Sequence, residues 1–364
     1  MTALAEIIRA RIAREGPMTV AEYMSLCLMH PDHGYYARGE PIGAAGDFIT
    51  APEVSQMFGE LLGLALAQAW LDQGRPAPFV LAEPGPGRGT LMADALRATR
   101  GVPGFHEALE LHLVEGGKRL RAVQAETLRT VALATGAAPA PVWHASVDGL
   151  PGKPLFLIAN EFLDALPIRQ FQRTAHGWRE RMIGLEEGRL VFGLGPETAV
   201  PALEGRLADT APGDIVETSA PVQGVVHAIA ERIARHGGAA IFIDYGDWRS
   251  RGDTFQAVRA HQTADPLAAP GQADLTAHVD FEAVSRAIAA AGARPTAVVP
   301  QGQLLAALGI GPRAAQLARG KSPAEADAIA DALERLTDAR EMGTLFKAVA
   351  AVPRGAPVPP GFTT

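Results

Sequence analysis

Three glycines at alternate positions follow an apolar stretch in the segment FVLAEPGPGRGTL, residues 79–91. Because Gly85, Gly87 and Gly89 lack a Cβ atom, backbone N–H groups there can approach a ligand closely, which is typical of a nucleotide-like ligand site. The dinucleotide fingerprint has its third glycine three residues after the second, where this chain has Thr90. The spacing therefore disfavours NAD. A plain glycine loop that closes a βα unit is the alternative.

Two carboxylates are placed to bind such a ligand. Glu83 comes just before the glycines, and Glu115 ends a predicted strand at residues 109–115, about 25 residues beyond them. A carboxylate at the end of this strand can accept hydrogen bonds from both ribose hydroxyls of an adenosyl ligand. We therefore predict Glu115 as the ribose ligand. An exposed acid at a strand end is the alternative.

A polar cluster follows the apolar strand in LFLIANEFLDALP, residues 155–167. Asn160, Glu161 and Asp164 come directly after the strand, which is expected beside the glycine strand. In an open α/β sheet, ligands lie beyond the carboxyl ends of the strands. These three side chains are therefore predicted to approach the substrate. Helix capping by Asn160 and Glu161 is the alternative interpretation.

A long segment rich in Gly, Pro and Asp, residues 30–52, is expected to be a functional loop. It contains Asp47, which could fold over the site; a turn aspartate is the alternative. Thr50 and Glu53 form a T-x-x-E pattern, which predicts a helix that starts there with a capping box and runs to about Gln73. Four further side chains are candidates for the same crevice without an assigned role: Asp244, Tyr245, His261 and His278.

Several function classes are disfavoured by composition and spacing. His30 and His33 form an H-x-x-H turn without further ligands at usable spacing, so no metal site is predicted. Cys27 is the only cysteine, which excludes an intrachain disulfide, and its apolar neighbours predict a buried side chain. The G-x-S-x-G motif of many hydrolases is lacking. A net charge of −7 without a basic tract disfavours nucleic acid as a partner.

The elements that position these residues alternate between strands and helices, as in a doubly wound sheet. Strands are predicted near residues 79–83, 110–115, 140–144, 154–159, 239–245, 295–299 and 345–352. Helices are predicted near residues 90–100, 117–134, 221–236 and 279–291. The fold class is therefore α/β, with a Rossmann-like sheet.

Three additions to this sheet are expected. An N-terminal helical extension with the loop occupies residues 1–75, and the sheet domain occupies residues 76–352. Within that domain, short Gly-separated strands near 168–220 predict an antiparallel β insertion, and residues 311–340 predict a helical addition. The proline-rich tail at 353–364 is expected to be poorly ordered. No apolar stretch is long enough to predict a membrane span.

Six segments in order along the chain together resemble the MidA family, class I S-adenosylmethionine (SAM) methyltransferases of bacteria and mitochondria. The segments are GYY at 34–36, GDFITAPEVSQMFGE at 46–60, EPGPGRGTL at 83–91, NEFLDALP at 160–167, IDYGD at 243–247 and DLTAHVDF at 274–281. Mitochondrial members of this family are protein arginine methyltransferases that assist assembly of respiratory complex I. The resemblance implies a class I methyltransferase fold and SAM as the cofactor.

By this resemblance, the three glycines would line SAM with Glu83 and Glu115 in support, while Asp47, Asn160, Glu161 and Asp164 would approach the acceptor. The family usually has proline and serine after Glu115, where this chain has two glycines, Gly116 and Gly117. These glycines are expected to make the ribose edge more flexible.

The resulting hypothesis is a protein arginine N-methyltransferase that acts on a complex I subunit during assembly. A bacterial cytoplasmic location is expected, because the first residues predict a helix and not a presequence. A small-molecule N- or O-methyltransferase and a non-catalytic assembly chaperone are the alternatives. The sequence leaves the oligomeric state open, with a homodimer among the states considered.

Overall fold

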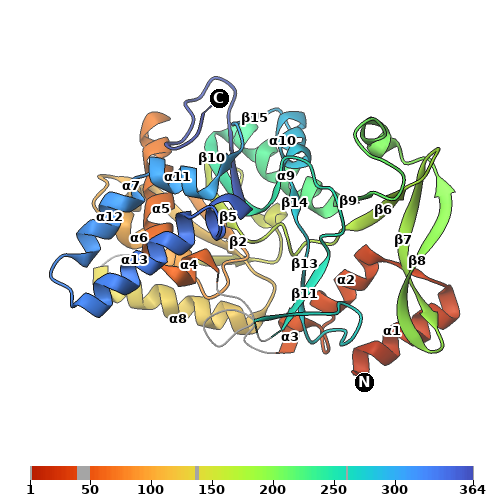
Figure 1. Ribbon diagram of the computed structural model, residues 1–364. Coiled ribbons are helices and arrows are strands. Elements are labelled where there is room, and N and C mark those ends of the chain that lie inside the picture. Colours follow the sequence, from red (N-terminus) through yellow and green to blue (C-terminus); the bar gives the residue numbers. More distant parts are fainter. Residues whose placement is uncertain (1, 39–49, 136–138, 260, 364) are drawn as a thin grey trace. The chain divides into compact units, whose positions relative to one another are not determined.

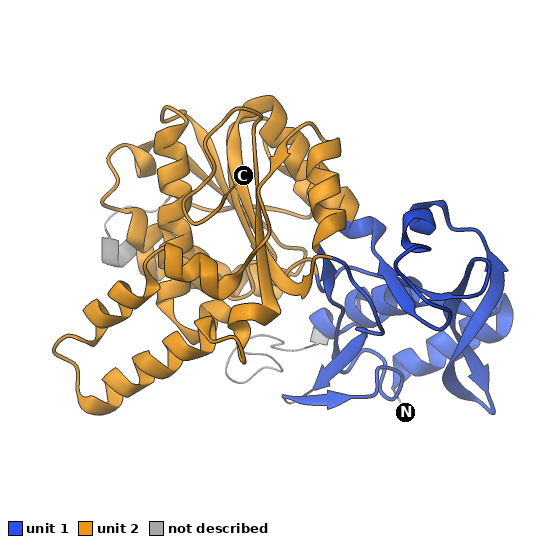
Figure 2. Ribbon diagram, turned by 45° about the horizontal axis from the view of Figure 1, so that its top comes forward, with its two compact units in different colours: residues 1–48, 164–222, 249–280 blue, residues 49–163, 223–248, 281–364 orange. Residues whose placement is uncertain are grey.

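The computed structural model describes residues 2–38, 50–135, 139–259 and 261–363. The chain forms two compact units, coloured separately in Figure 2. Unit 1 comprises residues 1–48, 164–222 and 249–280, and unit 2 comprises residues 49–163, 223–248 and 281–364. The N-terminal helices and the inserted strands therefore belong to one unit.

Unit 2 contains an open sheet with strand order β15-β17-β10-β5-β2-β3-β4, and β16 also pairs with β17 (Figure 1). The strands are β2 (Phe79–Pro84), β3 (Leu109–Val114), β4 (Val142–His144), β5 (Leu155–Asn160), β10 (Gly238–Asp247), β15 (Arg294–Pro295), β16 (Val299–Pro300) and β17 (Phe346–Val352). The central strands from β10 to β4 are parallel, whereas β17 runs antiparallel to β10. This arrangement confirms the predicted Rossmann-like α/β class.

The central strands are continuous apolar segments because both faces of the sheet are covered. All six residues of β2 and all six of β5 are buried. The helices of the sheet layer are α5 (Gln56–Asp72), α6 (Thr90–Thr99), α7 (Phe105–Ala108), α8 (Lys118–Thr135), α9 (Ala220–His236) and α10 (Phe281–Ala290). Rings of Trp70, Phe79 and Phe105 pack together in this core, with centroids 4.9–5.7 Å apart.

A helical addition lies between strands β16 and β17, as the sequence predicts. It consists of α11 (Gln301–Ala307), α12 (Ile310–Ala318), α13 (Pro323–Thr337) and α14 (Met342–Leu345). Figure 1 shows α12 and α13 as a helical hairpin at one side of unit 2. Arg313 of α12 donates to both carboxylate oxygens of the buried Glu60 of α5, at 2.7 and 3.0 Å. This bidentate pair joins the addition to the sheet layer.

The last residues pack onto unit 2, although their proline content predicts a poorly ordered tail. Phe362 is buried in the main apolar core. The N–H of Ala297 donates to the carbonyl of Thr363 at 2.9 Å. A single aromatic side chain near the end thus provides enough apolar area to order the segment.

Unit 1 combines helices with an antiparallel sheet. Its elements are α1 (Ala3–Glu15), β1 (Met18–Thr19), α2 (Val20–Met29), α3 (Tyr35–Arg38), β6 (Arg169–Arg173), β7 (Trp178–Glu186), β8 (Arg189–Thr198), β9 (Ile215–Thr218), β11 (Gln256–Arg259), β12 (Gln262–Ala264), β13 (Asp274–Thr276) and β14 (Val279–Asp280). The sheet order is β1-β7-β6-β9, with β8 on β7. The predicted antiparallel insertion therefore forms, and the N-terminal strand β1 joins it through Met18 opposite Ile183.

In the described part of the chain, no helix combines the length and apolar character that crossing a bilayer requires.

Candidate functional site

The strand order of unit 2 reverses direction at β2. From β2 the chain proceeds to β3 on one side, and it later returns to β5 on the other side of β2. Val80 and Ala82 of β2 pair with Leu155 and Leu157 of β5, so the carboxyl ends of these strands are adjacent. Ligands of open α/β sheets bind outside the carboxyl ends at such a switch point.

The glycine turn begins where β2 ends. Gly85, Gly87 and Gly89 have φ values of +62°, +53° and +83°, which L side chains rarely adopt. The N–H of Gly85 donates to Val114 at 3.0 Å, and that of Gly89 donates to Pro86 at 2.7 Å. These two donors are therefore engaged within the protein. Of the three glycines, Gly85 is exposed, whereas Gly87 and Gly89 are buried.

The helix predicted to begin at Thr50 is in fact two helices, α4 (Ala51–Val54) and α5. The Thr50 side chain makes no capping hydrogen bond, so the predicted capping box is wrong. Glu53 instead accepts a 2.6 Å hydrogen bond from the hydroxyl of Thr90, at the start of α6. Ser55 caps α5 by accepting from the N–H of Met57. Thr90, which replaces the third glycine of the dinucleotide fingerprint, thus anchors α6.

Glu83 is buried at the end of β2, with 4% of its surface exposed. Loss of hydration raises the pKa of its carboxyl to about 8, although the backbone N–H of Met92 partly offsets this effect. Its Oε2 atom has no hydrogen-bond partner among the described residues. A buried acceptor of this kind is costly unless a ligand pairs with it.

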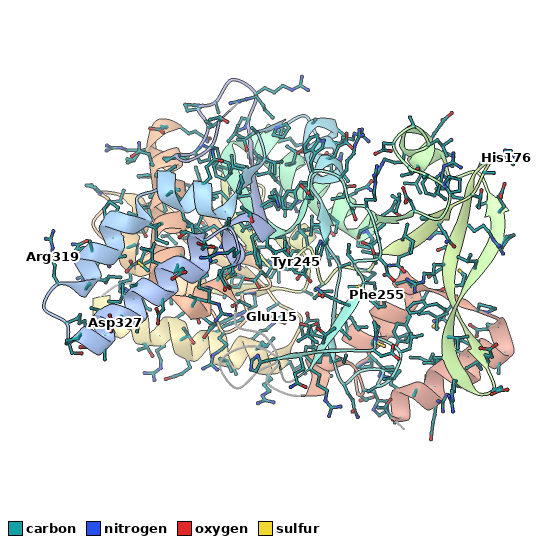
Figure 3. The ribbon with its side chains drawn as sticks, in the orientation of Figure 1. Glu115, His176, Tyr245, Phe255, Arg319 and Asp327 are labelled. Carbon is teal, nitrogen blue, oxygen red and sulfur yellow. The ribbon has the colours of Figure 1, made fainter. Side chains whose placement is uncertain are left out.

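Glu115, which is labelled in Figure 3, directly follows β3. Its Oε1 atom accepts from the N–H of Gly117 at 2.7 Å, and its Oε2 atom accepts from Nε2 of Gln124 at 3.3 Å. Burial raises the pKa of this carboxyl, against the effect of those two donors. The double glycine was expected to make this edge more flexible, but Gly117 helps to hold the carboxylate. A Cβ atom at Gly117 would lie 3.1 Å from Oε1.

At the end of β5, Asn160 and Glu161 lie together. The Glu161 Oε1 atom accepts from Nδ2 of Asn160 and from the N–H of Ala51, each at 3.0 Å. Burial raises the pKa of Glu161 to about 7, while these two donors and the charge of Arg335 oppose the rise. The Oδ1 atom of Asn160 is buried without a partner among the described residues. No helix lies between β5 and β6 in this described stretch, so the capping alternative does not apply.

Residues of β10 accept hydrogen bonds from the backbone of the loop that follows β5. Glu161 has a φ of +50°, and its N–H donates to Ile243 at 3.0 Å. Asp244 is fully buried and accepts from the N–H groups of Phe162 at 3.2 Å and Leu163 at 2.9 Å. A Cβ atom at Gly85 would lie 2.8 Å from the Phe162 ring, so the loop also contacts the glycine turn.

Asp164, predicted together with Asn160 and Glu161, falls in unit 1. There its carbonyl accepts from the N–H of Ala277 at 3.1 Å. Unit 1 also contains His261, with a φ of +61°, and His278, whose N–H donates to the Thr254 hydroxyl at 2.9 Å. Asp47 lies outside the described residues.

Tyr245 of unit 2 is buried, and its ring packs edge-on against Phe346 with centroids 5.7 Å apart.

Within the described ranges, no group of three or more His, Cys, Asp or Glu side chains could hold a metal ion. His30 and His33 stack on each other, with ring centroids 5.0 Å apart. Cys27 is fully buried, which raises the pKa of its thiol to about 12 and makes it unreactive. Its predicted burial is therefore confirmed.

Two residues of this region were not assigned a role from the sequence. Asp244 was a candidate only, because its function depends on β10 lying beside β5. Gln124 was missed, although it interrupts the apolar positions Leu120 and Leu128 at helical spacing on α8. A polar residue within an apolar stripe was the available signal.

Comparison with known proteins supports a methyltransferase assignment. Residues 61–299 match the family model described as "Putative S-adenosyl-L-methionine-dependent methyltransferase". Proteins named protein arginine methyltransferase NDUFAF7, mitochondrial, are similar over most of the chain. The Xenopus tropicalis protein is 36% identical and the human protein 35% identical, each over 94% of this chain and over 84% and 82% of their own lengths.

Solved structures agree with this result. A Burkholderia thailandensis protein described as a "likely methyl transferase", with S-adenosyl-homocysteine bound, superposes with a TM-score of 0.85 at 33% identity. The match covers 99% of this chain and 94% of that one. A native structure of a superfamily member from the same organism gives a TM-score of 0.82 at 32% identity, with the same coverage. The chain therefore belongs to the MidA-like family of SAM-dependent methyltransferases, as its motifs predict.

Proposed function

We propose that this methyltransferase methylates arginine side chains of a protein, and that the protein is a subunit of respiratory complex I during its assembly. The relatives named as protein arginine methyltransferases support the arginine acceptor. The complex I subunit rests on the family resemblance of the sequence. The observation that carries the proposal is the Glu161 carboxylate at the switch-point edge of the sheet, which accepts from Ala51 and has a pKa raised by loss of hydration.

The side chains at this edge fit SAM chemically. SAM has a cationic sulfonium and a cationic ammonium group, and the unpaired acceptors Glu83 Oε2 and Asn160 Oδ1 match a positive ligand. The ribose hydroxyls need acceptors, which the Glu115 carboxylate supplies. In our proposal Glu83, Gly85, Gly87, Gly89 and Glu115 bind the cofactor.

When bound, SAM supplies an activated methyl group whose bonding electrons return to sulfur as a nucleophile attacks the carbon. A guanidinium is a poor nucleophile because its lone pairs are delocalised. In the proposal Glu161 accepts guanidinium N–H groups, localises the positive charge and aligns one nitrogen with the methyl carbon. Its raised pKa also suits it to accept the proton that this nitrogen loses. Asn160 orients Glu161 through the 3.0 Å hydrogen bond.

We also propose Asp47 and Asp164 as acceptor-binding residues. Their support is the family resemblance of the segments that contain them. The bacterial cytoplasmic location and the lack of a nucleic-acid partner belong to the same proposal, whereas a homodimer is only one of the oligomeric states considered. Their support comes from the sequence.

Incubation with methyl-labelled SAM and cell extract tests the proposal. We expect label in protein, recovered as methylarginine after hydrolysis. Label in a metabolite fraction would instead support a small-molecule N- or O-methyltransferase.

The chaperone alternative is tested with Glu161→Gln. This variant should lose both methylation and assembly activity. Full assembly activity without methylation would support a non-catalytic chaperone.

A further inference from the structure

Gln124 of α8 is a buried polar side chain beside the glycine turn. It has 0% exposed surface and occupies the apolar stripe between Leu120 and Leu128. Burial of an amide is costly unless its donors and acceptor are paired. A glutamine at this position therefore depends on the partners around it.

Three hydrogen bonds connect the amide of Gln124 to three different segments. Its Nε2 atom donates to the carbonyl of Gly87 at 2.9 Å and to Oε2 of Glu115 at 3.3 Å. Its Oε1 atom accepts from Nε1 of Trp143 at 2.8 Å. Because an indole N–H can only donate, Trp143 fixes which end of the amide is oxygen. The NH₂ group must therefore face Gly87 and Glu115.

The helix backbone at Gln124 also limits the position of the turn. A Cβ atom at Gly89 would lie 3.5 Å from Cα of Gln124, which is ordinary van der Waals contact. Trp143 lies on β4 and pairs with Leu113 of β3. The amide thus connects the turn after β2, the carboxylate after β3 and the edge strand β4.

Both oxygens of Glu115 are oriented by protein donors. Gly117 holds Oε1 at 2.7 Å and Gln124 holds Oε2 at 3.3 Å. The backbone N–H of Gly116 also interacts with this carboxylate. A carboxylate has about four acceptor sites, so these three donors leave room for a ligand hydroxyl.

We propose that Gln124 is a positioning residue that fixes the glycine turn relative to the Glu115 carboxylate, and thereby sets the affinity for the adenosyl end of the cofactor. This inference rests on the cofactor placement proposed above. Gln124 acts through Gly87 and Glu115 and takes no part in methyl transfer itself. Its loss should therefore weaken cofactor binding far more than it slows the transfer step.

Gln124→Met is the first test, because methionine has similar length and volume but lacks the amide. We expect Kd for SAM and for S-adenosyl-homocysteine, measured by titration calorimetry, to rise about 10–100-fold. KM for SAM should rise in parallel, while kcat stays within about threefold. Gln301→Met is the matched control. Gln301 is also 0% exposed, and its Nε2 donates to the carbonyl of Leu336 at 3.0 Å, away from the turn. It should reduce thermal stability and leave both Kd values unchanged.

Gln124→Glu gives a second readout, the pH dependence of the affinity for SAM, which a purely structural role of Gln124 would not change. At pH 8 its carboxylate would face the Gly87 carbonyl and the Glu115 carboxylate, with no proton between them. Affinity for SAM should then fall at least as far as in Gln124→Met. It should recover at least about threefold at pH 6, as the paired carboxyl groups take up a proton. The Gln124→Met variant should lack this recovery.

A folded Gln124→Met protein that binds SAM within about threefold of the wild type would overturn the proposal. The proposal would also be overturned if Gln124→Met and Gln301→Met lost affinity for SAM to the same extent. A Gln124→Glu variant whose affinity for SAM does not recover at pH 6 would overturn it as well. Glu115→Ala separates this outcome from failure of the cofactor placement. If Glu115→Ala binds SAM normally, the proposed placement is wrong. If it binds weakly while Gln124→Met binds normally, only the positioning role is wrong.

Discussion

The carboxylate of Asp244 accepts the backbone N–H of Leu163 at 2.9 Å, which joins the end of β10 to the loop after β5. The same carboxylate accepts from Phe162 at 3.2 Å. Because Glu161 directly precedes these residues and has a φ of +50°, Asp244 helps to maintain an unfavourable backbone conformation. The proposed acceptor carboxylate is therefore positioned by the neighbouring strand.

Asp244→Asn should lower kcat about 10–100-fold. Oδ2 of Asp244 accepts from Phe162 and Leu163, and Oδ1 accepts from the N–H of Tyr245, so an amide nitrogen must oppose a backbone N–H in either orientation and disturb the loop that carries Glu161. Affinity for SAM should change less than kcat. Initial rates and calorimetry measure the two effects. Asp247→Asn is the control, since Asp247 is exposed at the end of the same strand and accepts from the N–H of Trp248. Equal losses in both variants would refute the positioning role of Asp244.

Gly85→Ala should weaken SAM binding at least about tenfold, or about 1.4 kcal/mol. A Cβ atom there would lie 2.8 Å from the Phe162 ring, and the φ of +62° disfavours any L side chain. Gly101→Ala is the control, because a Cβ atom at Gly101 has no neighbour within 4 Å. Calorimetry should show unchanged affinity for this control. Unchanged affinity in Gly85→Ala would contradict the role of the turn.

Glu161 should give the reaction a pH dependence. In the free enzyme its pKa is raised to about 7, so the deprotonated fraction grows as the pH rises through 7. The kcat/KM for the protein acceptor should therefore increase from pH 6 to pH 8. Glu161→Gln should lose this dependence and about 100-fold or more of kcat/KM. Glu126→Gln, at an exposed position on α8, should keep the wild-type profile.

Glu83→Gln should stabilise the cofactor-free protein at high pH. The folded-state pKa of Glu83 is raised to about 8 from 4.5, so its contribution to stability is complete below pH 4.5 and is lost as the pH rises through 8. Glutamine cannot ionise, so the gain should grow across this window and level off above it. Denaturant unfolding at pH 5 and pH 9 measures the difference.

The same variant should bind SAM more weakly, because it removes the anionic partner of the cofactor. Glu107→Gln, at an exposed position on α7, should change stability by less than about 0.5 kcal/mol at either pH. The gain in the free energy of unfolding of Glu83→Gln over the wild type should be larger at pH 9 than at pH 5. An equal gain at both pH values would show that burial does not penalise the ionised carboxyl as described.

The positions of the glycine turn and of the acids at strand ends could be predicted because they follow from short segments of the sequence alone. A Gly-rich turn after an apolar strand, followed by a helix, determines the position of Gly85 and Glu83 without knowledge of other strands. Glu115 and Glu161 required only the rule that ligands bind beyond carboxyl strand ends. The antiparallel insertion likewise followed from short strands separated by glycines.

Other features depend on sheet order and packing, which no short segment encodes. Asp244 acquires its role only because β10 pairs with β5, so that Ile243 lies opposite Asn160. Glu53 satisfies the sequence pattern of a capping box, yet Thr90 competes successfully for its carboxylate. Phe362 orders the final residues because an apolar surface of the helical addition is available to cover it.

The central claim is that the chain methylates arginine residues of a complex I subunit. Mass spectrometry of complex I subunits from cells with the wild-type protein, without it, and with Glu161→Gln tests this claim most directly. The account predicts a methylated arginine that is present with the wild-type protein and lost in the other two strains. Identical arginine methylation of every complex I subunit in all three strains would contradict it.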